Sequence, residues 1–414
     1  MDTVFVPSLI SQHLPMYYKN FFPFKSFCKW LYYGQPPGSY FALREFAFIL
    51  EGDVHLRFQS FGDSLEFERE LCKVNPEKLD IGAVYSHMPK DNKKFVDFHA
   101  VERELIFDID LTDYDDVRTC CSEAKVCPKC WRWITIAVKV LDKLLKEHFG
   151  FQHRLWVFSG RRGVHCWVAD EVARKLTNIG RAAVAEYLSL VDKKRSIRSR
   201  EVYVHPMIDE AYSIIMESGE IDKMVIEQQW FDDFDSWRLL VEHGCDPAVI
   251  SEVKTIFTDI GERCTGKQRW NAVRIKMDPV KRKELKENGI DLCDIAATDV
   301  VNVFRNFILQ RTYPRLDVNV STGVNHLLKS PFCIHPKTGR VAVPFSPGHV
   351  SRIEVDSLPR IDQLMNELSK VNVTEEKKEN RRFLAYKHTS LAPFIETFEA
   401  FVNDLTNSNC SGDL

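Results

Sequence analysis

Hydrophobic and polar residues alternate along residues 41–61, and this alternation predicts a β-hairpin. One face of the first run carries Leu43, Glu45, Ala47 and Ile49. The second run places Val54, Leu56 and Phe58 on one face, with polar residues between them. Gly52-Asp53 separates the two runs, as expected for a turn between antiparallel strands.

Further patterned segments complete a mixed α/β fold. Strands are predicted at 104–111, 155–159, 164–169, 316–320 and 341–343, with a Lys337-Thr338-Gly339 turn before the last. Helices are predicted at 14–22, at 134–149 and on both sides of the charged segment 375–382. The stretch 191–311 reads mostly helical. We therefore expect an α/β domain at 1–190, a helical insertion at 191–304, and a return to the first domain with C-terminal helices at 305–414.

Composition narrows the possible classes of protein. The 56 basic residues nearly cancel the 59 acidic ones, so a nucleic-acid site would have to be a local patch. No run of 18 apolar residues occurs, and Met1-Asp2-Thr3-Val4 lacks the pattern of a secretory signal, so neither a membrane span nor secretion is expected. The 12 cysteines are then expected to be reduced thiols of a cytosolic or nuclear protein.

Two aspartates stand out on the predicted strand 104–111. Alternation puts Asp108 and Asp110 on the face opposite the apolar residues, about 6.6 Å apart along the strand. Two like charges on a mostly apolar strand are costly unless a cation lies between them, which favours one or two divalent metal ions. Glu104 has the same strand parity as Asp108 and Asp110 and is a weaker candidate for a metal ligand. The alternative is a solvated acidic strand end, continued by Asp113, Asp115 and Asp116.

A second set of residues is suited to a polyphosphate. In Ser159-Gly160-Arg161-Arg162-Gly163-Val164-His165, two glycines bracket two arginines at a strand-to-strand turn. Glycine permits close backbone approach, and guanidinium groups bind phosphate bidentately. The alternative is a solvated basic hairpin tip. Asp317 alternates with apolar residues at 316–320 and could be a third metal ligand, while Arg57, Lys78, Lys329 and His335 could serve the same anion.

The third constellation consists of four cysteines. Cys120-Cys121 is followed by Cys127-Pro128-Lys129-Cys130, whose Cys-Pro-x-Cys turn presents two thiolates to one zinc ion. The adjacent pair can complete a closed, structural site of four thiolates, and the alternative is a set of buried free thiols. The other eight cysteines show no ligand spacing.

Taken together and in this order, these motifs resemble the small catalytic subunit of eukaryotic DNA primase, in the archaeo-eukaryotic primase superfamily. The matching segments are 56–61, 78–85, Phe107-Asp108-Ile109-Asp110, the cysteine cluster 120–130, 153–167 and 315–340, with a weaker similarity at 389–393. The resemblance covers roughly 1–190 and 305–345. It implies the primase catalytic fold, with central mixed or antiparallel sheets, a zinc-binding loop and a helical insertion subdomain.

The resemblance also implies a role for each matching residue. The catalytic, metal-binding acids are Asp108, Asp110 and Asp317. The nucleotide contacts are Arg57, Lys78, Asp80, Ser159, Arg161, Arg162, His165, Lys329 and His335, with Asp80 a possible ribose partner. The structural zinc ligands are Cys120, Cys121, Cys127 and Cys130.

The implied activity is synthesis of short RNA primers on single-stranded DNA from ribonucleoside triphosphates, with two Mg²⁺ or Mn²⁺ ions. The implied partners are a large iron–sulfur primase subunit and the polymerase alpha complex, in the nucleus. Lys193-Lys194-Arg195 could be only a solvated helix face, so nuclear location rests on the resemblance. Three alternatives remain open: a repair or translesion primase-polymerase, a non-catalytic zinc-knuckle nucleic-acid binder, and a metal-dependent phosphohydrolase.

Overall fold

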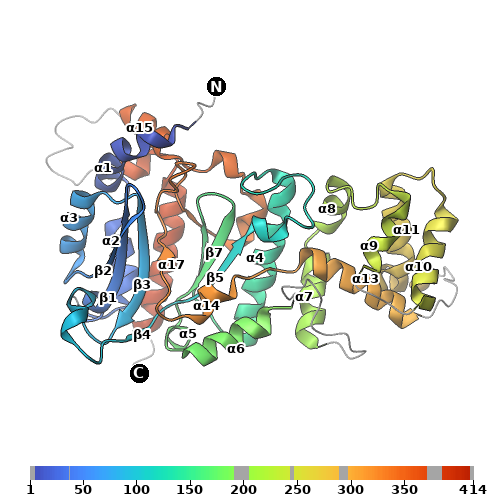
Figure 1. The fold of residues 1–414 in the computed structure, drawn as a ribbon, viewed down its shortest axis with the longest axis horizontal. Helices are drawn as coiled ribbons and strands as arrows, with labels where there is room; N and C mark the ends of the chain where they lie inside the picture. The colour runs from blue at the N-terminus through green and yellow to red at the C-terminus, as the bar shows by residue number, and fades with distance from the viewer. Residues whose placement is uncertain are drawn as a thin grey trace. The chain divides into compact units, whose positions relative to one another are not determined.

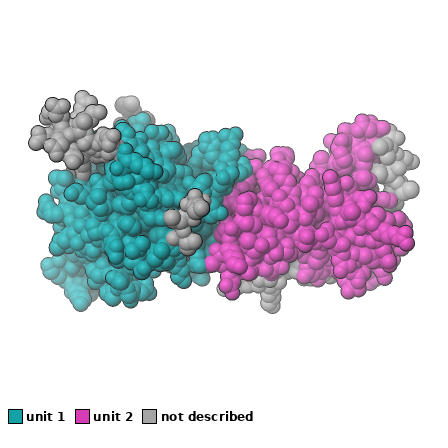
Figure 2. Space-filling model, turned by 90° about the horizontal axis from the view of Figure 1, so that it is seen from above, with its two compact units in different colours: residues 1–110, 145–186, 316–414 teal, residues 111–144, 187–315 magenta. Residues whose placement is uncertain are grey.

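The computed structural model describes residues 5–36, 38–190, 205–242, 247–288, 297–370 and 385–410. Lys193-Lys194-Arg195 and the charged segment 375–382 lie outside the described residues. The chain divides into two compact units, coloured separately in Figure 2. Unit 1 comprises residues 1–110, 145–186 and 316–414, and unit 2 comprises 111–144 and 187–315.

The first sheet of unit 1 contains the predicted hairpin (Figure 1). Its strands are β1 (Arg44–Leu50), β2 (Val54–Gln59), β3 (Lys78–Tyr85), β4 (Ala100–Glu102) and β8 (Leu328–Lys329). They run in the order β2-β1-β3-β4, with β8 beside β3, and all pairings are antiparallel. The predicted β1–β2 hairpin is therefore confirmed.

The second sheet of unit 1 is also antiparallel, in the order β5-β7-β6-β9. Its strands are β5 (Leu105–Asp110), β6 (Arg154–Phe158), β7 (Gly163–Val168) and β9 (Pro344–Phe345). The strands predicted at 104–111, 155–159 and 164–169 are confirmed. The strand predicted at 341–343 is wrong: Val341 forms only an isolated bridge with Ile334, and β9 starts after this segment, at Pro344.

Helices cover these sheets and share an aromatic core with them. Those assigned wholly or mainly to unit 1 are α1 (Ile10–Asn20), α2 (Phe24–Tyr32), α3 (Ser64–Val74), α5 (Glu171–Arg174), α6 (Asn178–Leu188), α14 (Val318–Thr322), α15 (Ile361–Ser369) and α17 (Ala392–Cys410). Trp30 of α2 packs edge-on against Trp167 of β7 and Phe398 of α17, with centroids 5.6 and 5.8 Å away. These rings therefore connect the second sheet with both helices. The predicted helices at 14–22 and after 359 are confirmed.

Unit 2 is helical, as the stretch 191–311 predicted. Its helices are α4 (Pro128–Phe149, which continues into unit 1), α7 (Pro206–Glu217), α8 (Ile221–Glu227), α9 (Trp237–Leu240), α10 (Pro247–Ile260), α11 (Gly266–Met277), α12 (Pro279–Glu287) and α13 (Ala297–Thr312). Trp270 stacks on Phe231 and Phe304 in its core. The helix predicted at 134–149 is confirmed, but it starts six residues earlier, at Pro128, a residue favoured in a first helical turn. Across the described ranges, no helix has the length and apolar character needed to span a membrane.

Candidate active site and cysteine cluster

Asp108 and Asp110 lie on one face of β5, as the alternation predicted. The alternate residues of the strand, Leu105, Phe107 and Ile109, are fully buried. The two aspartate side chains keep 26% and 33% of their exposure. On the neighbouring strand β7, His165 lies opposite Asp108 and Gly163 lies opposite Asp110. The two-residue period of the strand thus presents both acids at one surface of the second sheet.

His165 lies beside Asp108 and is neutral at physiological pH. Its Nε2 is 3.5 Å from Asp108 Oδ1. Burial, together with the positive charge of Lys329, lowers the pKa of His165 to about 3. Its Nδ1 is buried without a hydrogen-bond partner among the described residues. A buried ring nitrogen of this kind is stabilised when a ligand supplies its partner.

Asp317 does not lie on a strand, so the strand predicted at 316–320 is wrong. It is the N-cap of the short helix α14, and its carboxylate accepts a hydrogen bond of 3.1 Å from the backbone N–H of Asn319. Five alternating residues match a single helical turn as well as a strand, and aspartate is a favoured N-cap. The backbone N–H of Asp317 donates to the carbonyl of Asp108 at 3.2 Å, so the structure brings the first and third predicted acids together.

Two further hydrogen bonds hold α14 in place. Ser321 Oγ donates to the carbonyl of Ile106 on β5 at 2.6 Å. Just after the helix, Arg103 Nη1 donates to the carbonyl of Gly323 at 3.1 Å. Because the Asp317 N–H bond to Asp108 holds the first end of α14 and these two bonds hold its last turn, the helix is fixed at both ends.

The turn between β6 and β7 requires both of its glycines. A Cβ on Gly163 would lie 2.3 Å from the carbonyl oxygen of Ile109. Gly160 has a φ of +91°, and a Cβ there would lie 2.7 Å from the Cβ of His335. Because side chains are excluded at both positions, the backbone of β7 approaches β5, and His335 packs directly on the turn. The backbone N–H of Gly163 donates to Ser159 Oγ at 3.1 Å, which closes the turn.

The two arginines of this turn lie near different partners. Arg162 Nε contacts both carboxylate oxygens of Asp110, at 2.7 and 2.8 Å. Arg161 contributes positive charge near His335, whose pKa falls to about 3 because of burial, Lys329 and Arg161. Arg162 therefore neutralises one of the predicted metal-binding acids in the described structure, and His335 is neutral.

Lys329 connects the first sheet with the turn of the second. On β8 it lies opposite Asp80 of β3, and its ammonium group donates to the carbonyl of Ser159. Burial lowers the pKa of Lys329 and raises the pKa of Asp80. Because these two residues are register partners, they share one face of the first sheet, next to the Ser159 turn.

Two predicted nucleotide contacts on the first sheet already have ion-pair partners. Lys78 is on the same face as Asp80 by strand parity, and its ammonium lies 3.3 Å from the exposed Asp53. Arg57 of β2 forms a bidentate pair with Glu45 of β1, at 3.0 and 3.1 Å. Both cations therefore belong to the first sheet.

Glu104, the weaker metal candidate, has a structural partner instead. It is completely buried and forms a bidentate ion pair with Arg44, at 2.8 and 2.9 Å, and it accepts a hydrogen bond from Tyr33 Oη at 2.5 Å. Its parity matched that of Asp108, but it lies immediately before β5, where its buried carboxylate is enclosed by these donors.

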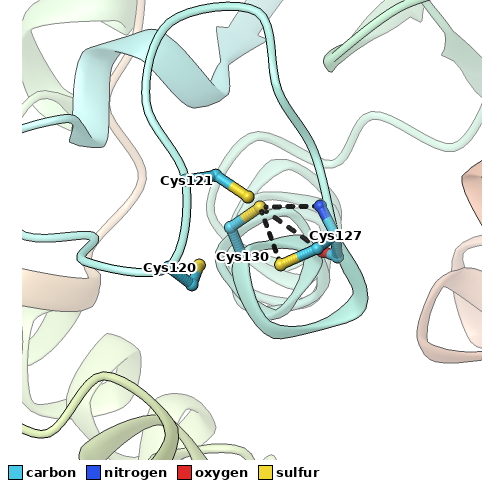
Figure 3. A group of neighbouring side chains, drawn as sticks. All are labelled: Cys120, Cys121, Cys127 and Cys130. Atoms are coloured by element: carbon cyan, nitrogen blue, oxygen red, sulfur yellow. Dashed lines mark hydrogen bonds between the residues drawn. The ribbon is translucent and has the colours of Figure 1, made fainter.

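The four predicted zinc ligands converge in unit 2 (Figure 3). The Sγ atoms of Cys120, Cys121, Cys127 and Cys130 all lie within 4.8 Å of one another. The backbone N–H of Cys127 donates to Cys130 Sγ at 3.2 Å. Burial raises the pKa of Cys127, but backbone N–H groups of Lys129 and Cys130 and the Cys121 thiol lower it by more. This set of four sulfur donors fits a closed, structural zinc site.

Gln228, which follows α8, supports the cysteine cluster from a distant part of the sequence. Its Nε2 donates to Cys120 Sγ at 3.3 Å. Its Oε1 accepts from the backbone N–H groups of Thr119 at 2.7 Å and Cys120 at 3.2 Å. The amide therefore fixes the segment that carries the first two cysteines.

Replacing Gln228 with Leu is expected to weaken zinc binding by about tenfold or more, because the loss of groups that orient metal ligands has effects of this size. Competition with a chromogenic chelator on the full-length chain would measure the effect. The exposed neighbour Gln229 has a φ of +57°, so Gln229→Asn, which tolerates this conformation, is the matched control and is expected to retain zinc. Equal zinc retention in Gln228→Leu and wild type would contradict this prediction.

Sequence reasoning missed Glu45, Arg103 and Gln228 as residues that support the site. Glu45 carried one local signal, an acidic residue directly before the apolar run 46–50. The partners of Arg103 and Gln228 lie more than 100 residues away, so no local pattern could have identified them.

Enzymes that transfer nucleotidyl groups use acidic side chains to hold metal ions and neighbouring cationic side chains to bind the polyphosphate. Residues 107–347 match the model of the family described as DNA primase small subunit. A Caenorhabditis elegans protein of that name is 49% identical over 95% of this chain and 97% of its own length. Relatives of that name in Drosophila melanogaster and Saccharomyces cerevisiae are 36% and 33% identical, over 99% and 95% of this chain and 94% and 92% of their own lengths.

The chain therefore belongs to the DNA primase small subunit family. This family comprises the catalytic subunits of DNA primase, so the chain is an enzyme, a nucleotidyltransferase of the RNA polymerase type.

Proposed function

We propose that the chain synthesises short RNA primers on single-stranded DNA from ribonucleoside triphosphates, by two-metal-ion nucleotidyl transfer, and so initiates DNA replication. One observation carries the proposal: the hydrogen bond from Asp317 N–H to the Asp108 carbonyl joins acids that are 209 positions apart in the sequence. It supports a common acidic surface formed by β5 and α14, adjacent to the Ser159–Gly163 turn.

The donor set fits divalent metal ions. Asp108, Asp110 and Asp317 supply carboxylate oxygens, the ligands that Mg²⁺ and Mn²⁺ prefer, and Asp108 and Asp110 are partly exposed on an otherwise buried strand. These three residues would hold the two ions. Divalent ions held there would supply Lewis-acid chemistry, lowering the pKa of the attacking 3′-hydroxyl and stabilising the leaving pyrophosphate.

The surrounding side chains are assigned to the nucleotide. The triphosphate would be bound by Ser159, Arg161, Arg162, His165, Lys329 and His335. Arg57 and Lys78 would be further contacts, and Asp80 is the candidate ribose partner. Arg162 is well placed to exchange its contact with Asp110 for phosphate oxygens, because a guanidinium binds either anion bidentately. The neutral His165 and His335 can contact phosphate as hydrogen-bond donors without adding charge.

The finer organisation also belongs to the proposal. The two antiparallel sheets are assigned to the archaeo-eukaryotic primase catalytic fold, at 1–190 and 305–414, and the stretch 191–304 to a helical insertion subdomain. The Cys120–Cys130 segment is assigned as the zinc-binding loop of the catalytic fold, with a structural rather than a catalytic ion. The curated relatives are named small subunits, so we further propose a large iron–sulfur subunit as partner, in a nuclear assembly with the polymerase alpha complex.

An assay of RNA primer synthesis tests the proposed function. Full-length protein is incubated with labelled ribonucleotides, a bare single-stranded DNA template and Mn²⁺. Wild type is expected to make template-dependent oligomers, and Asp108→Asn, which keeps the size of the side chain but removes its charge, is expected to make none. Asp97, with a side chain 75% exposed, provides the matched control: Asp97→Asn should retain wild-type product.

Two outcomes would contradict the proposal. Oligomer synthesis by Asp108→Asn at the wild-type level would exclude the assigned metal site. Consumption of nucleotides without a template and without oligomers would indicate the phosphohydrolase alternative.

A further inference from the structure

A buried carboxylate on β1 holds one of the exposed cations of the first sheet. The Glu45 side chain is fully buried, whereas the Arg57 side chain is 40% exposed. Besides its two bonds from Arg57, the Glu45 carboxylate accepts the backbone N–H of Phe58 at 3.1 Å and the phenol of Tyr85 at 3.0 Å. Four donors from β2 and β3 thus satisfy one carboxylate on β1.

The backbone is distorted at this point to make the arrangement possible. Between the pairs Phe46–Gln59 and Phe48–Leu56 the register shifts, so β2 has one extra residue, a β-bulge. Phe58, within the bulge, has a φ of +59°, a left-handed conformation that bulky residues rarely adopt. Backbone strain of this kind persists where surrounding structure enforces it, often at functional sites.

The neighbouring side chains are equally constrained. A Cβ at Gly82 of β3 would lie 3.0 Å from Glu45 Cβ, so this strand approaches Glu45 closely only because position 82 is glycine. The ring of Tyr85 stacks on Phe98 with a centroid distance of 4.4 Å and an interplanar angle of 3°. The Arg57 guanidinium lies over the ring of Phe58, 4.7 Å from its centroid. Rigid rings therefore surround the Glu45–Arg57 pair.

The geometry leaves hydrogen-bonding capacity on Arg57. A guanidinium has five N–H donors in a fixed plane, and the bidentate pair with Glu45 uses two of them. The plane is thereby fixed while donors remain for another anion. On the same sheet, strand parity puts Lys78 and Asp80 on the face of Glu45. The fixed Arg57 guanidinium therefore belongs to the same sheet as Lys78 and Lys329, two other cations assigned to the nucleotide.

We propose that Glu45 and Tyr85 are positioning residues that lock the Arg57 guanidinium in the orientation in which it binds a phosphate oxygen of the incoming or initiating ribonucleoside triphosphate. The inference rests on the proposed function, because it needs Arg57 to contact a nucleotide. Glu45 itself touches no substrate, since its carboxylate is buried and fully hydrogen-bonded. It acts by removing the conformational freedom that a long side chain would otherwise lose on binding.

A double-mutant cycle on the full-length chain tests this inference. Glu45→Gln is expected to raise the KM for ribonucleotides about tenfold with little change in kcat, because a charge-assisted, bidentate contact is lost. Arg57→Ala should raise KM by at least as much. The Glu45→Gln/Arg57→Ala double variant should have the KM of Arg57→Ala alone, since Glu45 acts only through Arg57.

A milder variant tests the same inference in case Glu45→Gln fails to fold. Tyr85→Phe keeps the stacked ring and removes one hydrogen bond, so KM should rise about threefold, again without further effect in the Arg57→Ala background. The inference would be overturned if the KM increases of the single variants multiplied in the double variants, or if Arg57→Ala had the KM of wild type. In both cases wild type would still carry out template-dependent synthesis. If instead the proposed function were wrong, wild type itself would make no template-dependent product.

Discussion

Replacement of Asp317 by Asn is expected to reduce the rate of template-dependent nucleotide incorporation by about 10²- to 10³-fold, with no change in stability. Asp317 has two separable roles. Its side-chain oxygen caps α14 by accepting the Asn319 N–H, and its charge completes the proposed metal site. Asparagine caps a helix about as well as aspartate does, so Asp317→Asn removes the charge alone.

Asp317→Ala removes both roles, and it should lose the same activity and also about 1 kcal/mol of stability. Asp63 supplies the matched control, because it caps α3 by accepting the Glu66 N–H at 2.8 Å and has no assigned part in the reaction. Asp63→Ala should lose similar stability and keep its kcat. The measurements are kcat at saturating nucleotide and Mn²⁺, and thermal unfolding. Full activity in Asp317→Asn would remove this residue from the proposed metal site.

The parts of the site that could be predicted from sequence depend on local periodicity. A two-residue period places Asp108 and Asp110 on one face of β5 wherever that strand lies in the fold, and the structure confirms this placement. The spacing of the four cysteines likewise constrains their geometry within one short loop, and their sulfur atoms converge. Both features follow from residues close together in the chain.

The remaining features depend on contacts that local patterns do not contain. The segment 316–320 alternates over five residues only, and the Asp317 cap together with packing on β5 selects a helical turn instead of a strand. Glu45 is stable when buried because donors arrive from two other strands, and a single strand's pattern does not reveal them. The same applies to Glu104, whose strand parity matched that of the proposed metal-binding acids Asp108 and Asp110 although its partner is Arg44.

Replacement of Glu104 by Gln is expected to lower the free energy of unfolding by about 3–5 kcal/mol, the usual cost of removing one partner of a buried ion pair. The side chains of Arg44 and Glu104 both have 0% exposure. Without the carboxylate, the Arg44 charge would be buried with only neutral partners, including the carbonyl of Gly82 at 3.1 Å. Urea titration of the full-length chain at neutral pH would measure the loss.

Neighbouring arginines increase the expected effect. Arg103, Arg174 and Arg181 are also buried, and the nearby acids are Glu102 and Glu104. Burial lowers the pKa of Arg103 to about 9, although Glu104 opposes this shift. Removing the negative charge of Glu104 therefore leaves a group of buried cations with less compensation. The exposed pair Lys73–Glu70 is the matched control, and Glu70→Gln should change stability by less than about 1 kcal/mol.

The effect of Glu104→Gln should also depend on pH. Burial raises the pKa of Glu104. The charge of Arg44 and the hydrogen bonds from Arg44 and the Tyr33 phenol lower it by more, so that it falls from an ordinary 4.5 to about 2. A depressed carboxyl pKa stabilises the folded state above pH 4.5, and this stabilisation disappears as the pH falls from 4.5 towards 2. The stability difference between wild type and Glu104→Gln should therefore be greatest near neutral pH and shrink as the solution is acidified through this range. A difference that stays constant down to pH 2 would show that the pair does not depend on the ionised carboxylate.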